Sequence, residues 1–115
     1  MNFSEAPEFA KELKKFKKSY RTLDDDLVEF KKVVAVLHLP EMSHLFAGSA
    51  FAKLKITENQ TVIKARLDCA ALGNKQMLRV TLILANNGKS AQFIELYAKN
   101  IKAREDTPRI KSYLN

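Results

Sequence analysis

Two apolar stripes at helical spacing precede Pro40, and each repeats at intervals of three and four residues. The first stripe consists of Phe9, Leu13, Phe16 and Tyr20, and the second of Leu27, Phe30, Val34 and Leu37. Thr22 with Asp25 three residues later resembles a capping box at the start of the second helix. Pro40 ends this helix by about Leu39. The short connection between the stripes predicts an antiparallel helical hairpin.

After Gly48 the period changes from 3.6 to two, which predicts β-strands. Alternation is weak over residues 51–57 and clear over the three later segments. These segments are Thr61–Cys69, Met77–Ala85 and Ser90–Lys99. In the last of them we expect Ile94 and Leu96 to be buried, with Phe93 facing outward.

Turn residues separate the strands and a short helix ends the chain. Glu58-Asn59-Gln60 and Asn86-Asn87-Gly88 predict tight turns, because asparagine and glycine adopt the conformations that such turns need. A final helix is expected from about Asp106 to Leu114, with Thr107 as its cap and Pro108 at its first position.

The elements together predict an α+β fold. An N-terminal antiparallel helical hairpin packs on one face of a three- to four-stranded, mainly antiparallel sheet, and a short C-terminal helix follows. The 115 residues suit a single domain over 1–115, with 46% hydrophobic and 29% charged residues, a balance that excludes a disordered chain. The longest apolar run, Val33–Leu37, is too short to cross a bilayer.

Cysteine content and the N-terminus bear on compartment and cofactors. The single Cys69 cannot form an internal disulfide, and no zinc-binding spacing is present. Three adjacent carboxylates at 24–26 start a helix and point in different directions, so they do not predict a metal site. No secretory signal is visible. We therefore expect a cytoplasmic protein without metal, small-molecule cofactor or membrane contact.

The positive charge is concentrated in two regions. The 20 lysine and arginine residues outnumber 13 aspartate and glutamate residues, which gives a net charge of +7. Residues 9–21 carry six basic residues and one acid, and residues 61–115 carry ten basic and four acidic residues. An acidic stretch, 22–30, separates them. Such an excess favours a nucleic acid or an acidic protein as partner.

Strand alternation places several of these charges on the sheet face away from the core. The expected set comprises Lys64, Arg66, Arg79, Glu95, Tyr97 and Lys99. If the strands are neighbours, guanidinium groups that bind phosphate oxygens lie close to a tyrosine that can stack on a base. The alternative is an ordinary solvated face, which one-sided antiparallel sheets also have.

Three sequence runs resemble toxins of the RelE/ParE superfamily. They are Val62-Ile63-Lys64-Ala65-Arg66, Leu78-Arg79-Val80, and Phe93-Ile94-Glu95-Leu96-Tyr97-Ala98-Lys99. The lysine-rich segment from Phe9 to Tyr20, followed by Asp26-Leu27, is similar to the first helix of these toxins. The resemblance extends from about Phe9 to Leu114 and rests on the order of diffuse patterns rather than on an invariant motif.

The resemblance implies the toxin of a type II toxin–antitoxin module, acting as a ribosome-dependent, metal-independent mRNA endoribonuclease. On this analogy Arg79 stabilises charge on the phosphate, and Lys64 and Arg66 bind the RNA backbone. Lys99, as a further catalytic candidate, or Arg104, as an RNA-binding one, would match basic residues near the family's C-terminal segment.

Further roles are hypotheses from placement. Tyr97 or Glu95 could act in acid–base catalysis. The basic first helix could contact ribosomal RNA, or be an ordinary solvated helix face. Its candidate RNA-binding residues are Lys11, Lys14, Lys15 and Lys18.

Two alternatives stay open: a non-enzymatic, ParE-like inhibitor of DNA gyrase, and an inactive toxin-fold binding protein. All three functions imply a cognate antitoxin, while the enzyme also requires ribosome and mRNA. His38 and His44 precede the sheet, so the enzyme would have to use lysine and arginine chemistry where some members of the superfamily use a C-terminal histidine.

Overall fold

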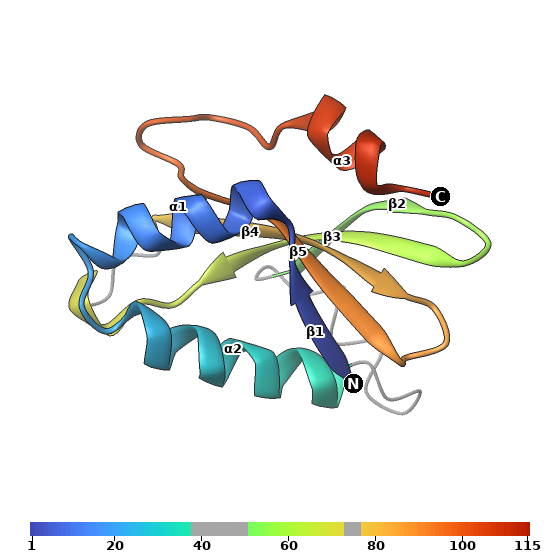
Figure 1. Ribbon diagram of the computed structural model, residues 1–115, viewed down its shortest axis with the longest axis horizontal. Helices are drawn as coiled ribbons and strands as arrows, with labels where there is room; N and C mark the ends of the chain where they lie inside the picture. Colours follow the sequence, from blue (N-terminus) through green and yellow to red (C-terminus); the bar gives the residue numbers. More distant parts are fainter. Residues whose placement is uncertain (38–50, 73–76) are drawn as a thin grey trace.

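The computed structural model describes residues 1–37, 51–72 and 77–115 (Figure 1). Its elements, in chain order, are β1 (Asn2–Glu5), α1 (Pro7–Lys17), α2 (Leu23–Leu37), β2 (Phe51–Ile56), β3 (Gln60–Leu67), the 3₁₀ turn η2 (Ala70–Leu72), β4 (Leu78–Ala85), β5 (Ser90–Ala98) and α3 (Thr107–Tyr113). The strands form one sheet in the order β1-β5-β4-β3-β2. All neighbours are antiparallel except β1 and β5. No helix within the described residues is long and apolar enough to span a membrane.

The residues at the start of α1 and α2 favour the beginning of a helix. Pro7 starts α1, where its missing N–H is not needed, and lysines fill the last turn. The hydroxyl of Thr22 donates to the Asp26 carboxylate at 2.8 Å just before α2. This carboxylate also accepts from the Ala70 N–H at 3.3 Å, which ties the helix start to η2. The acidic partner of Thr22 is thus Asp26, one residue beyond the predicted Asp25.

The sheet has two different faces, and Figure 1 shows α2 on one side of it and α3 on the other. On the first side, the helical face, Phe9 of α1 and Phe30 of α2 both pack against Phe93 of β5, with ring centroids 5.1 and 6.1 Å apart. The opposite side, the far face, carries the C-terminal segment. The helical face holds most of the hydrophobic core.

The N-terminal helical hairpin and the strand count need correction. The chain begins with strand β1, not with a helix, and the sheet has five strands where three or four were expected. Strand β1 has only four residues and pairs in parallel with β5, from Asn2 opposite Ser90 to Glu5 opposite Phe93. A segment so short, with only Phe3 partly buried, has no alternation from which it could be predicted.

A bulge in β5 overturns the prediction for Phe93. Leu82 pairs with Phe93 while the preceding Thr81 pairs with Glu95, so Ile94 is an extra residue in the strand. The bulge brings Phe93 to the helical face, where it is 0% exposed. It leaves Glu95 on the far face, as expected.

The turn and end predictions are mostly confirmed. Gly88 has φ 79°, and its N–H donates to the Ala85 carbonyl, as in a tight hairpin turn. The final helix is present, but its N-cap is Asp106, whose side chain accepts from the Arg109 N–H at 3.1 Å. Thr107 is therefore inside the helix. Predictions on His38, Pro40, His44 and Gly48 lie outside the described residues.

Candidate nucleic-acid interface

Four candidate residues meet on the far face. Arg66, Arg79 and Tyr97 lie directly opposite one another on β3, β4 and β5. The next row on this face is Lys64, Thr81 and Glu95. Lys64, Arg66, Arg79 and Tyr97 together are called the far-face cluster below. Neighbouring strands are about 4.8 Å apart, so the cluster fits a surface one or two phosphates wide.

The two arginines repel each other across the strand pair. Burial and the positive charge of Arg66 lower the pKa of Arg79. Like charges directly opposite in a sheet cost stability. Residues that cost stability where they stand often serve binding, and a phosphate between two guanidinium groups would offset their repulsion.

Tyr97 is held in its protonated form. Burial raises the pKa of its phenol, and the carboxylates of Glu105 and Glu95 raise it further. The Lys102 ammonium lies 5.8 Å from the centre of the ring. The hydroxyl of Tyr97 can therefore give a proton or a hydrogen bond at neutral pH, and is unsuited to taking a proton.

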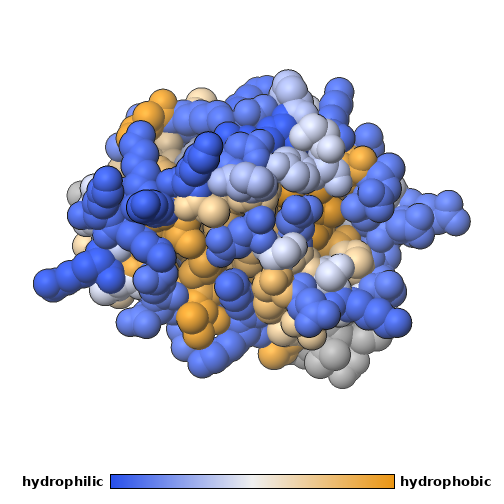
Figure 2. All heavy atoms as spheres, in the orientation of Figure 1, coloured by the Kyte–Doolittle hydropathy of each residue, from blue (hydrophilic) through white to orange (hydrophobic). Residues whose placement is uncertain are grey.

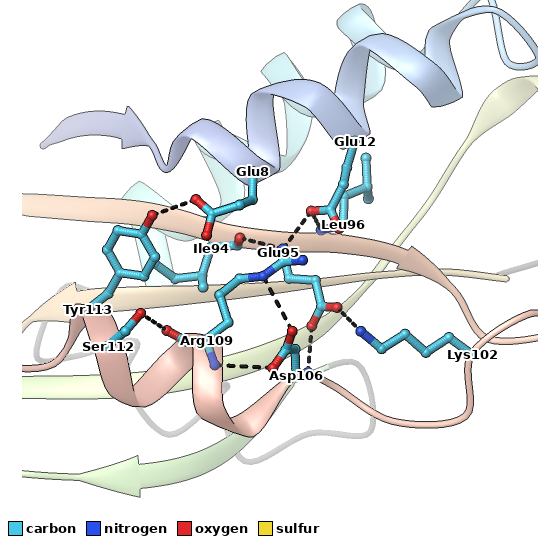
Figure 3. Close-up of polar contacts among 10 residues, drawn as sticks. All are labelled: Glu8, Glu12, Ile94, Glu95, Leu96, Lys102, Asp106, Arg109, Ser112 and Tyr113. Carbon is cyan, nitrogen blue, oxygen red and sulfur yellow. Dashed lines mark hydrogen bonds and ion pairs between the residues drawn. The ribbon is translucent and has the colours of Figure 1, made fainter.

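Glu95 is completely buried and binds the segment that follows β5. One carboxylate oxygen accepts from the Asp106 N–H at 2.8 Å, and the other from the Lys102 ammonium (Figure 3). Burial of a carboxylate costs free energy on folding unless it has such partners. These contacts hold residues 102–106 against the far face.

Glu105 lies beside the far-face cluster, and sequence reasoning did not single it out. Its carboxylate is 3.2 Å from the Lys64 ammonium, with side-chain exposures of 17% and 31%. Burial opposes ionisation of Glu105, but a backbone hydrogen bond and Lys64 outweigh it and lower the pKa of Glu105. Lys64 is thus paired with a carboxylate in the free protein.

The other candidate cations lie apart from the cluster or at its margin. Lys99 is exposed just beyond β5, and its backbone N–H donates to the Met77 carbonyl. Arg104 is exposed and lies near enough to Glu105 to lower its pKa. The lysines of the first helical segment are exposed, and α1 covers the helical face, so they form a separate basic surface. These are Lys11, Lys14, Lys15 and Lys18.

The edge of β5 beyond β1 is closed by side chains, not by a strand. Glu12 of α1 accepts from the Leu96 N–H at 3.1 Å, and Arg109 of α3 donates to the Ile94 carbonyl at 3.2 Å. The two side chains also pair at 2.9 Å (Figure 3). They satisfy the backbone groups that a longer β1 would have bonded.

Metal-ligating side chains and the single cysteine were the other candidates for chemistry. Within the described residues, no group of three or more histidine, cysteine, aspartate or glutamate side chains could hold a metal. The buried Cys69 has a pKa raised by burial, which disfavours the reactive thiolate. The face seen in Figure 2 is mainly hydrophilic, with hydrophobic residues showing in the middle of the view.

Sequence comparisons identify no family, since no protein-family description and no curated protein sequence matches the chain. A structural match exists to a chain in the crystal structure of the archaeal RelE–RelB complex from Pyrococcus horikoshii OT3. The TM-score is 0.58 at 16% sequence identity, over 85% of this chain and 93% of that chain. This likeness supports the RelE-like fold that the sequence runs suggested, and it does not separate RelE from ParE. The chain has a RelE-like fold.

Proposed function

We propose that this protein is the toxin of a type II toxin–antitoxin module and cleaves mRNA on the ribosome without a catalytic metal. The observation that carries the proposal is the row of Arg66, Arg79 and Tyr97 with Lys64 beside it. Three cations and a protonated phenol on neighbouring strands suit a phosphodiester whose negative charge increases during reaction. The likeness to a chain of a RelE–RelB complex adds support from the fold.

In the proposed reaction on the ribosome, the bonds that form and break belong to the RNA, and the side chains and solvent bind charge and transfer protons. The 2′-oxygen of a ribose attacks the adjacent phosphorus and forms a 2′,3′-cyclic phosphate. The bond from phosphorus to the 5′-oxygen of the next nucleotide breaks, and this oxygen takes a proton. The proton of the 2′-hydroxyl goes to solvent.

Each catalytic role follows from the chemistry of the side chain. Arg79 stabilises the charge that develops on the phosphate oxygens. Lys64 binds the same phosphate, and Arg66 binds the neighbouring backbone. Tyr97, with its raised pKa, suits the acid that protonates the leaving 5′-oxygen. Glu95 we assign to anchoring residues 102–106, because both its oxygens are engaged.

The outlying cations and the partners are part of the same proposal. Lys99 and Arg104 extend the RNA path from the edge of the far-face cluster. The exposed lysines of the first helical segment contact ribosomal RNA, which needs only positive charge at the surface. A cognate antitoxin with an acidic or amphipathic segment would neutralise the toxin.

The test is induction of the protein alone in bacterial cells, followed by measurement of translation and of mRNA ends. We expect translation to stop and mRNA to be cut, leaving 2′,3′-cyclic phosphate ends. Arg79→Ala should lower the cleavage rate on purified ribosomes by about a hundredfold or more. Arg21→Ala is the matched control, because Arg21 is exposed in the connection between α1 and α2.

The outcomes separate the function classes. Cleavage that is equally fast in Arg79→Ala would refute the catalytic role of the far-face cluster. Inhibition of gyrase supercoiling without mRNA cleavage would replace the proposal with the gyrase alternative.

A binding protein without cleavage is the second candidate. Two observations on the acidic groups favour it: Glu95 is buried, so it cannot reach RNA, and Glu105 is paired with Lys64. Such a protein would bind RNA with the same dependence on Lys64 and Arg79, yet leave it intact.

A further inference from the structure

Glu105 acts electrostatically on two strands of the far face at once. Its carboxylate contacts Lys64 of β3, and its charge is a cause of the raised pKa of Tyr97 of β5. Those strands are separated by β4, so they are roughly 10 Å apart. Glu105 therefore lies beside the far-face cluster, in contact with Lys64 and close enough to Tyr97 for its charge to raise the pKa of the phenol.

The segment that carries Glu105 is also held by contacts in which Glu105 takes no part. Glu95 binds both Lys102 and the Asp106 N–H, on either side of it in the sequence. The backbone at 105 is therefore held against the sheet, which places the Glu105 carboxylate next to Lys64. Under these contacts lies Thr81, which is 0% exposed and whose hydroxyl has no hydrogen-bond partner among the described residues.

Resting on the proposed function, we propose that the Glu105 carboxylate occupies the place of an RNA phosphate and must leave Lys64 before RNA binds. A carboxylate and a phosphate present the same kind of charged oxygen to an ammonium group. The two anions would repel each other if both stayed near Lys64, so binding of one excludes the other. Glu105 thus sets the affinity of the site and limits binding to ligands that outcompete a tethered carboxylate.

The first experiment measures binding of a short 2′-O-methyl RNA oligonucleotide, which cannot be cleaved, by fluorescence anisotropy. Glu105→Gln should bind about fivefold more tightly than the wild type, since Lys64 no longer has to lose a carboxylate partner before it binds the phosphate. Glu29→Gln is the matched control: it removes the same charge and also releases a paired lysine, Lys32, but lies on α2 away from the far face. It should change affinity by less than about twofold.

A Lys64→Met background gives the internal check. If Glu105 acts by occupying Lys64, Glu105→Gln should give no gain once Lys64 is absent. A gain in Glu105→Gln no larger than in Glu29→Gln, or a gain that persists in Lys64→Met, would overturn the inference.

A second probe, pyrophosphate, distinguishes failure of the inference from failure of the proposed function. Tighter pyrophosphate binding in Glu105→Gln, together with no RNA binding by any variant, would support the inference and refute the RNA function. RNA binding that depends on Lys64 and Arg79 but is unchanged in Glu105→Gln would support the RNA function and refute the inference.

Wild-type protein alone provides a measurement that does not depend on the folding of a variant. On titration with pyrophosphate, the backbone amide signals of Lys64 and Glu105 should shift together in NMR spectra. The Glu105 pKa should rise as its carboxylate loses Lys64. Signals of Glu105 that stay unchanged while Lys64 shifts would contradict displacement.

Discussion

Thr81 is the buried residue on the far face whose hydroxyl lacks a hydrogen-bond partner among the described residues. It lies between Lys64 and Glu95 in the strand register, yet bonds to neither. A buried hydroxyl without a partner costs free energy on folding, because it loses its bonds to water. The buried Thr81 hydroxyl therefore lowers the stability of the folded protein at this site.

Replacing Thr81 with valine, which has nearly the same shape, should raise the free energy of unfolding by about 1 kcal/mol. Urea denaturation of the purified protein measures this change. Thr57→Val is the control, because the Thr57 hydroxyl both donates to and accepts from the Gln60 backbone, and its loss should destabilise the protein. Loss of stability in Thr81→Val would mean that the hydroxyl has a partner such as a bound water.

At the scale of elements, the side-chain pair Glu12–Arg109 takes the place of a strand at the edge of β5. Both side chains are mostly buried, and each also bonds a backbone group of β5. Burial alone would lower the pKa of Arg109, but the bond to Glu12 outweighs it and raises that pKa. The pair joins α1, α3 and the sheet.

Glu12→Ala should lower the free energy of unfolding by about 2 kcal/mol, because it leaves a charged guanidinium and a backbone N–H without their partner. Hydrogen exchange of the Leu96 amide should also become faster. Glu29→Ala removes an exposed ion pair on α2 and should cost no more than a few tenths of a kcal/mol, as is usual for surface pairs. Equal losses in the two variants would show that the Glu12 contacts add nothing beyond a surface charge.

The elements also show what could be read from the sequence. The alternation in β3 and β4 correctly placed Lys64, Arg66 and Arg79 on one face, because regular strands keep a period of two. It failed at Phe93, since the bulged residue Ile94 puts Phe93 on the opposite face from the one that strict alternation with Glu95 and Tyr97 predicts, and nothing in the local sequence marks the bulge. The hydrophobic pattern predicted the buried residues of the regular strands, but it did not predict the bulge in β5.

The C-terminal segment explains the rest of what the sequence could not show. Alternation put Glu95 and Tyr97 on the far face, but both are buried there, because residues 99–113 fold back over them. Lys102, Glu105 and Arg109 come from a stretch without periodicity, and their partners are 7 to 97 residues away in the chain. Only the tertiary fold brings these charges together.

At the scale of the whole molecule, α3 is attached through ionisable contacts at both of its ends. Glu105 binds Lys64 near its start, and the Tyr113 hydroxyl donates to Glu8 at 2.6 Å near its end. The bond from Tyr113 lowers the pKa of Glu8, and Glu8 in turn raises the pKa of Tyr113. The pKa of Glu105 is lowered as well.

These directions define a pH window for the attachment. A carboxyl group with a lowered pKa in the folded state stabilises that state above its ordinary pKa of 4.5, and this contribution is lost as pH falls through the folded value. A tyrosine with a raised pKa contributes below its ordinary value of 10.0, and this is lost as pH rises through the folded value. Attachment should be strongest between these limits.

We therefore expect residues 107–113 to lose hydrogen-exchange protection below about pH 4.5, before the strands do, after correction for the intrinsic pH dependence of exchange. The double variant Glu8→Gln, Glu105→Gln should show weaker protection of these residues at pH 7 and little further loss in acid. The strand amides of β3 and β4 serve as the internal reference, because their bonds join backbone to backbone. If α3 and the strands lose protection at the same pH in the wild type, the ionisable contacts do not control the attachment, and the far face would open only by global unfolding.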